Sequence, residues 1–89
     1  MFKEPFIQEL ADEVFDEGVT VVREAGGSLD DHSHPFKAKA LILEGELRIR
    51  TADAECRYGA GDVFHLAAHV PHSEVYGPAG VTYLVGRKK

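Results

Sequence analysis

Apolar residues at helical spacing mark the first fifteen positions of the chain. They recur at intervals of three and four residues and form one apolar stripe, which consists of Phe6 or Ile7, Leu10, Ala11 and Val14. Pro5 is compatible with a first helical turn, where its missing N–H costs nothing. Residues 16–18, Asp-Glu-Gly, end the pattern. The spacing predicts a short helix within residues 1–17 that must pack on the rest of the chain, because it is too short to be stable alone.

From Gly18 onward the pattern changes to short β-branched or alternating runs, each bounded by Gly, Pro or Asp. The predicted strands cover residues 19–22, 37–43, 47–51, 54–58, 63–66, 73–76 and 81–85. Turns are expected between them, among others at 44–46 and at 77–80. Six to eight short strands at this spacing predict an all-β, antiparallel sandwich or barrel over residues 18–89.

Composition limits the function classes. The chain of 89 residues suffices for one small domain, and its net charge of −5 argues against a nucleic-acid or anionic-membrane surface. The only basic cluster, Arg87-Lys88-Lys89, is expected to be a solvated tail. A barrel of this size has a small core, so we expect a homodimer that extends it.

The sequence also bears on the compartment. A single cysteine, Cys56, cannot form an intrachain disulfide and is interpreted as a structural thiol. No apolar run approaches the ~20 residues needed to cross a membrane, and the acidic N-terminal segment has no apolar core of a signal peptide. These features favour a cytoplasmic protein.

Two histidines one residue apart carry the clearest chemistry. On an extended strand, His32 and His34 point to the same face, with Cα atoms ~7 Å apart. His72 follows the turn-like pair Val70-Pro71 and starts another strand. If the two strands are neighbours, three imidazoles meet and form an open metal site with positions left for water or substrate. The alternative is that these are ordinary histidines with hydrogen-bonded partners.

The chain resembles a small single-domain cupin over residues 19–86. The first cupin motif is Gly, five residues, His-x-His, three or four residues, Glu, six residues, Gly; the second is Gly, five residues, Pro-x-Gly, two residues, His, three residues, Asn. The matching positions are Gly26, His32, His34, Gly45, Gly61 and His72. Ala67, His69 and Tyr76 replace the Pro, Gly and Asn of the second motif. The resemblance implies a double-sheet, jelly-roll β-barrel.

The resemblance also implies that His32, His34 and His72 hold a divalent ion together with a glutamate, which this sequence lacks. The three-residue spacing places the missing glutamate at Ala38, and the looser spacing places it at Lys39. Alternation favours Ala38, since it turns inward while Lys37 and Lys39 turn outward, unless a bulge at Pro35 shifts the count. Three neutral imidazoles suit Zn, Ni, Cu or Fe(II) better than Mg or Ca.

Other polar residues near the motif have open roles. His69 could be a fourth ligand, a proton carrier behind the ligands, or an exposed turn histidine. Glu74 shares the parity of His72 and could orient an imidazole, stand in as a carboxylate ligand, or be an ion-paired strand residue. His65 is expected on the outer face. Asp30 and Asp31 serve the turn or accept imidazole N–H groups.

A small apolar pocket is expected beside the histidines. Its predicted lining is Phe36, Ala38, Ala40, Ile42 and Tyr76, with Tyr83 either in the pocket or packed in the barrel. Such a lining suits a small organic ligand. The hypotheses are a metal-dependent enzyme of dioxygenase or isomerase type, as the resemblance allows, a non-catalytic binding or sensing module, or a barrel that has lost its chemistry. No nucleophile elbow, phosphate loop or dinucleotide fingerprint is present.

Overall fold

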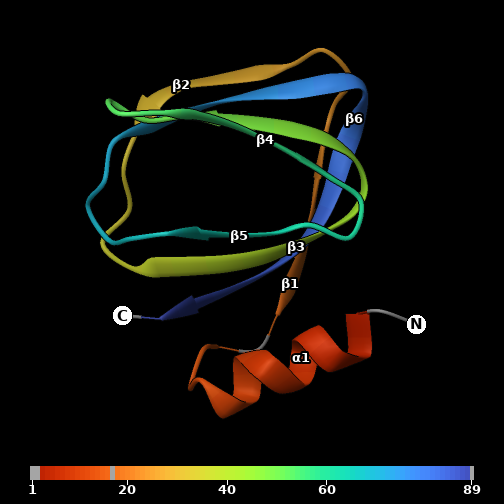
Figure 1. The fold of residues 1–89 in the computed structure, drawn as a ribbon, viewed down its shortest axis with the longest axis vertical. Helices are drawn as coiled ribbons and strands as arrows, with labels where there is room; N and C mark the ends of the chain where they lie inside the picture. Colours follow the sequence, from red (N-terminus) through yellow and green to blue (C-terminus); the bar gives the residue numbers. More distant parts are fainter. Residues whose placement is uncertain (1–2, 17, 89) are drawn as a thin grey trace.

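The computed structural model describes residues 3–16 and 18–88. One helix precedes six strands within this part of the chain (Figure 1). The elements are α1 (Lys3–Asp12), β1 (Val19–Arg23), β2 (Ser28–His32), β3 (Lys37–Arg50), β4 (Glu55–Gly59), β5 (Val63–Leu66) and β6 (His72–Lys88). All strand pairs are antiparallel. The predicted all-β fold with a short N-terminal helix is therefore confirmed.

Two long strands, β3 and β6, bend and contribute to both layers of the barrel. One layer combines β1 and β5 with the paired segments 37–45 and 81–88 of the long strands. The other combines β2 and β4 with segments 46–50 and 72–76. We call these the helix-covered layer and the histidine layer. Figure 1 shows them one above the other, and this is the double-sheet architecture that the sequence predicts.

Turns were expected at 44–46 and 77–80, but the structure has continuous strands there. Each segment is a corner at which a long strand passes from one layer to the other, and the register of β3 against β6 shifts between Ile42 and Leu47. Gly45 and Gly80 have positive φ angles of 85° and 77°. A Cβ on Gly45 would collide with the carbonyl oxygen of Gly80, and a Cβ on Gly80 would collide with the carbonyl oxygen of Arg23, so both corners require glycine.

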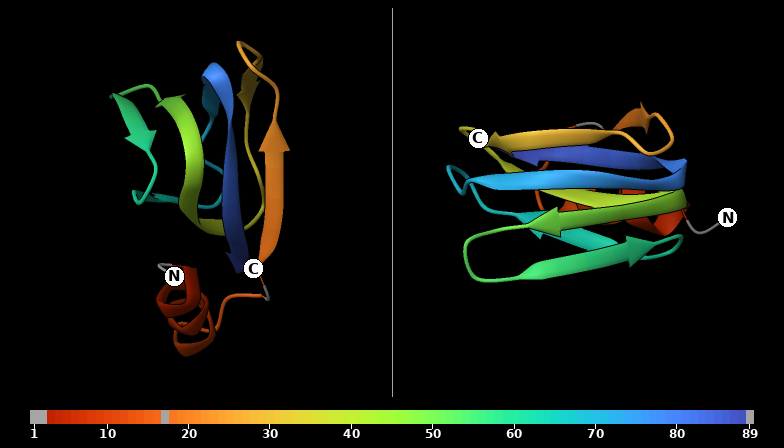
Figure 2. Two further views of the ribbon diagram at one scale, coloured as in Figure 1. Left: turned by 90° about the vertical axis from the view of Figure 1, so that its right-hand side faces the viewer. Right: turned by 90° about the horizontal axis from the view of Figure 1, so that it is seen from above.

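The helix-covered layer has two buried faces. Ala38, Ala40 and Ile42 lie in the barrel core, as the predicted alternation requires. The barrel core comprises Ala38, Ala40, Ile42, Leu47, Ile49, Phe64, Tyr76, Val81, Tyr83 and Val85. The opposite face of the same layer packs against α1, which lies outside the barrel in Figures 1 and 2.

Only part of the predicted helical stripe is buried. Phe6 and Leu10 pack on Leu41 and Leu84, and each is 2% exposed. Val14 is 74% exposed, because the helix ends at Asp12 and Val14 takes a left-handed φ of 64°. The prediction that Val14 belongs to the apolar face is wrong. Of the expected stop at 16–18, Glu17 lies outside the described residues.

Lys39 points out of the barrel, as expected, yet it is buried. The helix covers it, and its Nζ lies 3.0 Å from Glu9 Oε1 and 2.7 Å from Glu13 Oε2. Lys37, two residues earlier on the same face, is exposed. The contact between α1 and the barrel therefore combines an apolar patch with a buried cation that has two carboxylate partners.

The basic cluster at the chain end is not a solvated tail over its described part. Arg87 and Lys88 belong to β6 and are half-buried. Lys88 donates a hydrogen bond to the Glu13 carbonyl and lies 5.6 Å from the centre of the Phe15 ring. Lys89 lies outside the described residues. Within residues 3–16 and 18–88, α1 is the only helix and is too short to cross a membrane.

Candidate metal centre

Three imidazoles meet at the end of the histidine layer. His32 ends β2 and pairs directly with His72, the first residue of β6, as expected if the two strands were neighbours. The ring centres lie 4.3 Å apart for His32 and His72, 5.0 Å for His32 and His34, and 5.1 Å for His34 and His72. Each ring offers one nitrogen, and all three nitrogens lie within 4.8 Å of one another.

His34 is positioned by a loop rather than by a strand. The prediction that both histidines lie on one extended strand is wrong, because β2 ends at His32 and a register shift precedes it. The His69 N–H donates to the His34 carbonyl at 2.7 Å, and the Phe36 ring stacks on the imidazole at 4.9 Å. The His69 side chain is exposed in its turn, where φ is 65°. His69 thus contacts this site through its backbone.

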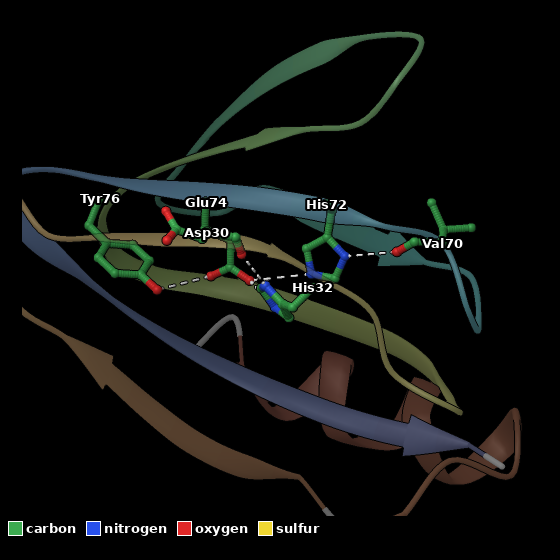
Figure 3. Close-up of polar contacts among 6 residues, drawn as sticks. All are labelled: Asp30, His32, Val70, His72, Glu74 and Tyr76. Atoms are coloured by element: carbon green, nitrogen blue, oxygen red, sulfur yellow. Dashed lines mark hydrogen bonds and ion pairs between the residues drawn. The ribbon is translucent and has the colours of Figure 1, made fainter.

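Backbone carbonyls orient two of the rings. His32 Nδ1 lies 2.7 Å from the Asp30 carbonyl and His72 Nδ1 lies 3.0 Å from the Val70 carbonyl (Figure 3). A carbonyl accepts only from a protonated nitrogen, so Nδ1 carries the hydrogen and Nε2 keeps its lone pair. Asp30 therefore contributes its carbonyl, not its carboxylate. This is the arrangement that metal-bound histidines commonly show.

One of the nitrogens that face one another is buried without a hydrogen-bond partner. His72 is 1% exposed, and its Nε2 has no hydrogen-bond partner. Burying such a group without a partner costs roughly 1–3 kcal/mol. Burial, followed by the neighbouring His72 and His32, lowers the pKa of His34 and favours the neutral form that binds metals. The chemistry of the donor set and the unpaired nitrogen both fit a divalent transition metal.

Glu74 is a buried carboxylate beside these rings. Its Oε1 accepts a hydrogen bond from the Tyr76 hydroxyl at 3.2 Å, and its Oε2 lies 3.6 Å from His32 Nε2 and 3.5 Å from His72 Nε2. Burial, and then the charge of Glu74, raise the pKa of Tyr76 to about 12, so its hydroxyl stays protonated and can donate. Tyr76 therefore contributes a hydrogen bond from the barrel core.

A cavity of about 200 Å³ opens beside His32 and His34. Its wall is formed by Val21, Arg23, Leu29, His32, His34, Phe36, Ala38, Phe64, Leu66, Glu74, Tyr83, Val85 and Arg87. Phe36 and Ala38 lie on this wall. Ala40, Ile42 and Tyr76, which were also expected in the lining, are buried in the barrel core instead, because the small cavity does not extend that deep.

The cavity wall includes two arginines that the sequence patterns did not single out. Arg87 lies with its guanidinium carbon 5.5 Å from the centre of the Phe36 ring, and Arg23 interacts with Tyr83. Alternation could have identified both: Arg23 follows the inward Val21, and Arg87 follows the inward Val85 by two residues. Burial and Glu74 raise the pKa of Tyr83.

The other histidine and the cysteine lie elsewhere. His65 is exposed, as expected for the outer face, and lines a separate cavity of about 530 Å³ between the end of α1 and β5. Among the described residues, the only group of three or more metal-ligating side chains is His32, His34 and His72. Cys56 is exposed on β4 with a free thiol.

Comparison with known proteins agrees with this architecture. A cupin-domain family model matches residues 19–76, which include all three clustered histidines. The chain belongs to the cupin family. The structure supplies what the sequence resemblance leaves open, namely where this cupin places the three imidazoles and what surrounds them. A comparison with curated protein sequences gives no significant match.

Solved cupin structures share the fold at low sequence identity. An RmlC-like cupin from Shewanella frigidimarina has a TM-score of 0.68 at 22% identity, over 82% of this chain and 66% of that one. The DMSP lyase DddQ from Ruegeria pomeroyi gives 0.73 at 25%, over 81% and 37%. Bacillus subtilis oxalate decarboxylase, which has Mn(II) centres, gives 0.73 at 22%, over 81% and 20%. The chain thus spans less than two thirds of each of these proteins.

Proposed function

We propose that this cupin binds one divalent transition metal through His32, His34 and His72 and holds a small organic molecule in the adjoining cavity. The observation that carries the proposal is the buried His72 Nε2, which has no hydrogen-bond partner and faces two more imidazoles. A protein that needed these histidines only for packing would have paired that nitrogen. Zn, Ni, Cu and Fe(II) suit the imidazole donors, and Mn(II) occurs in a cupin neighbour.

The charges of the cavity wall favour an anionic ligand. Although the chain carries a net charge of −5, the wall contains two arginines and one carboxylate, Glu74. Within the described part of the chain, Arg87 has no hydrogen-bond acceptor or ion-pair partner, and its guanidinium lies over Phe36. A guanidinium binds carboxylates through paired hydrogen bonds. We therefore propose a small carboxylate as the ligand class, which a cavity of about 200 Å³ can hold.

Different residues of the cavity have different roles in this proposal, with the histidines binding the metal and the arginines binding the organic ligand. A divalent ion at the histidines supplies Lewis-acid or oxygen-activating chemistry. Arg87 and Arg23 bind and orient the anionic end of the ligand. Phe36 covers His34 and, with Leu66 and Phe64, excludes water from one side of the cavity. This arrangement supports a metal-dependent enzyme acting on a small organic acid.

A second candidate is a non-catalytic binding module. Apart from the histidines and arginines, Glu74 and Tyr83 are the only titratable groups on the described cavity wall. His69 and Tyr76, the other candidates for acid–base work, do not border it. Oxygen uptake by the Fe(II)-loaded protein, screened with small diketones, thiols and aromatic acids, separates the two. Turnover of any of these supports the enzyme, whereas tight carboxylate binding without turnover across metals supports the module.

The metal is tested on protein purified without a polyhistidine tag. After incubation with Zn, Ni and Fe(II) and removal of excess ions, we expect about one ion per wild-type chain and none in the His32→Ala/His34→Ala variant. Metal-free wild type would contradict the proposal. For the ligand, Arg87→Gln should weaken carboxylate binding by about tenfold or more, while Arg57→Gln, on exposed β4, should not.

We further propose a homodimer in the cytoplasm. β1 is an edge strand of the sheet; its outward Val22 is 71% exposed, and Val19 at its beginning is 47% exposed. An edge with exposed valines is a ready surface for a second copy. Light scattering should give a mass near twice 9.8 kDa, and Val22→Lys should lower it toward that of one chain. A wild-type monomer at micromolar concentration would contradict the dimer.

A further inference from the structure

Glu74 follows His72 on the inward face of β6. Residues 72, 74 and 76 are buried while 75 is exposed, so the side chains of His72, Glu74 and Tyr76 all point into the barrel. Since His72 on β6 pairs with His32 on the neighbouring strand β2, the Glu74 carboxylate lies close to both rings. Figure 3 shows it between Tyr76 on one side and the two imidazoles on the other.

The distances match ligands of one ion better than hydrogen bonds. Glu74 Oε2 lies 3.6 Å from His32 Nε2 and 3.5 Å from His72 Nε2. A hydrogen bond between such atoms would measure 2.7–3.2 Å. Two donors on one tetrahedral ion, each bonded at about 2.1 Å, lie about 3.4 Å apart. Oε2 therefore has the spacing of a donor that shares an ion with both imidazoles.

The other carboxylate oxygen is already occupied. Tyr76 donates to Oε1 at 3.2 Å, which leaves Oε2 free and holds the carboxylate in one orientation. Carboxylates that bind metals are commonly fixed by such an outer hydrogen bond. Tyr76 stands where the family motif has asparagine, so this replacement also supplies a donor to Glu74.

Glu74 forms no short ion pair with a lysine or arginine of the described residues, although the charge of Arg23 on the same cavity wall acts on it. The residue is 7% exposed. A buried carboxylate without a directly paired cation is costly. A divalent ion beside Oε2 would remove that cost and satisfy His72 Nε2 at the same time.

We propose that Glu74 is the carboxylate ligand of the metal, supplied from β6 in place of the glutamate that the family motif would put at Ala38. This rests on the proposed three-histidine site. Ala38 belongs to the helix-covered layer and Glu74 to the histidine layer, yet both line the same cavity. The donor set becomes three imidazoles and one carboxylate, which also suits Mn(II) and Fe(II). The space at Ala38 is then left for the ligand.

The first test replaces the carboxylate with its amide. Glu74→Gln keeps the size of the side chain and can still accept from Tyr76. We expect it to weaken Co(II) binding by about 100-fold or more and to change the visible absorption spectrum of bound Co(II). The control Glu44→Gln removes an exposed carboxylate from β3 and should change neither the affinity nor the spectrum.

The second test moves the carboxylate back. Ala38→Glu in the Glu74→Gln background should recover Co(II) affinity to within about tenfold of wild type. If Glu74→Gln binds Co(II) with wild-type affinity and spectrum, or weakens binding without a spectral change or recovery by Ala38→Glu, Glu74 is not a ligand. In either case the His32→Ala/His34→Ala variant still reports separately on the histidine site.

A third measurement needs no variant and serves if a substitution prevents folding. In a crystal structure of the Zn-loaded wild-type protein, Oε2 should lie about 2.0–2.2 Å from the ion. A separation beyond about 3 Å would overturn the inference while leaving the three-histidine site intact. Failure of the wild-type protein to bind any of these metals would overturn both.

Discussion

Two buried polar clusters lie on opposite faces of the barrel wall, and they differ in how completely the protein pairs them. On the outer face, Lys39 lies under α1 with the carboxylates of Glu9 and Glu13 at 3.0 and 2.7 Å. Inside the barrel, among the described residues, His72 has an Nε2 without a hydrogen-bond partner and Glu74 has no lysine or arginine within ion-pair distance. The polar groups of the first cluster are paired within the chain. Those of the second cluster gain their partners only when a ligand such as a metal ion binds.

This difference distinguishes buried polar residues that stabilise the fold from buried polar residues that are prepared to bind a ligand. A buried cation with two acidic partners fixes where the helix packs, and its charge is already paired within the protein. A buried imidazole whose Nδ1 is bound to a carbonyl while Nε2 is free is a prepared ligand. Substitutions in the outer cluster should therefore change stability but not binding, and substitutions in the inner cluster should do the reverse.

The largest effect is expected for His72→Leu. The variant removes the unpaired Nε2 but also the hydrogen bond from Nδ1 to the Val70 carbonyl, so the free energy of unfolding of the metal-free protein should fall by no more than about 1–2 kcal/mol. In wild type, a free metal concentration of 100 times the dissociation constant adds about 2.7 kcal/mol to the free energy of unfolding. In His72→Leu this stabilisation should disappear. Denaturation with and without Zn measures both. A His65→Leu control, at an exposed site, should retain the full metal effect.

Lys39→Ala should destabilise the protein by about 1–2 kcal/mol, since it removes the cation beneath α1. The loss is moderate because Glu9 and Glu13 are 54% and 46% exposed and can turn to water. Metal affinity should stay at the wild-type value. Urea denaturation measures the loss of stability and Co(II) titration measures the metal affinity, with Lys37→Ala, at an exposed site, as the control. A weaker metal site in Lys39→Ala would contradict the separation of the clusters.

Acid should act on the outer cluster through Glu13. The hydrogen bond from Lys39 lowers the pKa of Glu13 below its usual value of 4.5. A carboxylate with a depressed pKa stabilises the fold above its unfolded pKa, and this contribution is lost as the pH falls through the folded value. Unfolding of metal-free wild type should thus become easier below about pH 4.5, and more steeply than for Glu13→Gln. Identical slopes for both proteins would contradict the role of this pair.

The smallest effect is expected for Cys56→Ser. The thiol is exposed on β4 and belongs to neither cluster. Stability should change by no more than about 0.5 kcal/mol, and the metal content per chain should not change. Elemental analysis of this variant beside wild type checks whether the thiol contributes a ligand, and a lower metal content would extend the site beyond the inner cluster.

The sequence was informative where residue spacing has a geometric meaning. Alternation along residues 37–43 placed Ala38 inward, and the motif spacing brought His32 and His72 to paired positions. Those inferences depend only on the two-residue period of a strand and on which strands are neighbours. The all-β fold therefore follows from the pattern of the chain. The three-histidine cluster, by contrast, was expected from the cupin resemblance and on the condition that the two strands are neighbours, and His34 reaches it from a loop.

The sequence was less informative about what covers each face. Alternation places Lys39 outside the barrel, but nothing in the strand shows that a helix lies over it. The glycines at 45 and 80 looked like turns, because a corner within a strand and a turn between strands use the same residue type. Arg87 looked like part of a charged tail, since β6 was expected to end at Val85. Each of these differences comes from packing between distant segments.

The two bent strands also determine how the molecule can move. β3 and β6 pair along most of their length and pass together through both layers, so neither layer can swing away without breaking the hydrogen bonds that hold the other. Amide exchange in both layers should accordingly follow one global opening. Of the two short segments joined by the bond from His69 to His34, residues 33–36 contribute His34 and Phe36 to the cavity wall, and residues 67–71 hold them from behind through that bond. Substitutions that loosen this loop pair should therefore change how the cavity opens without unfolding the barrel.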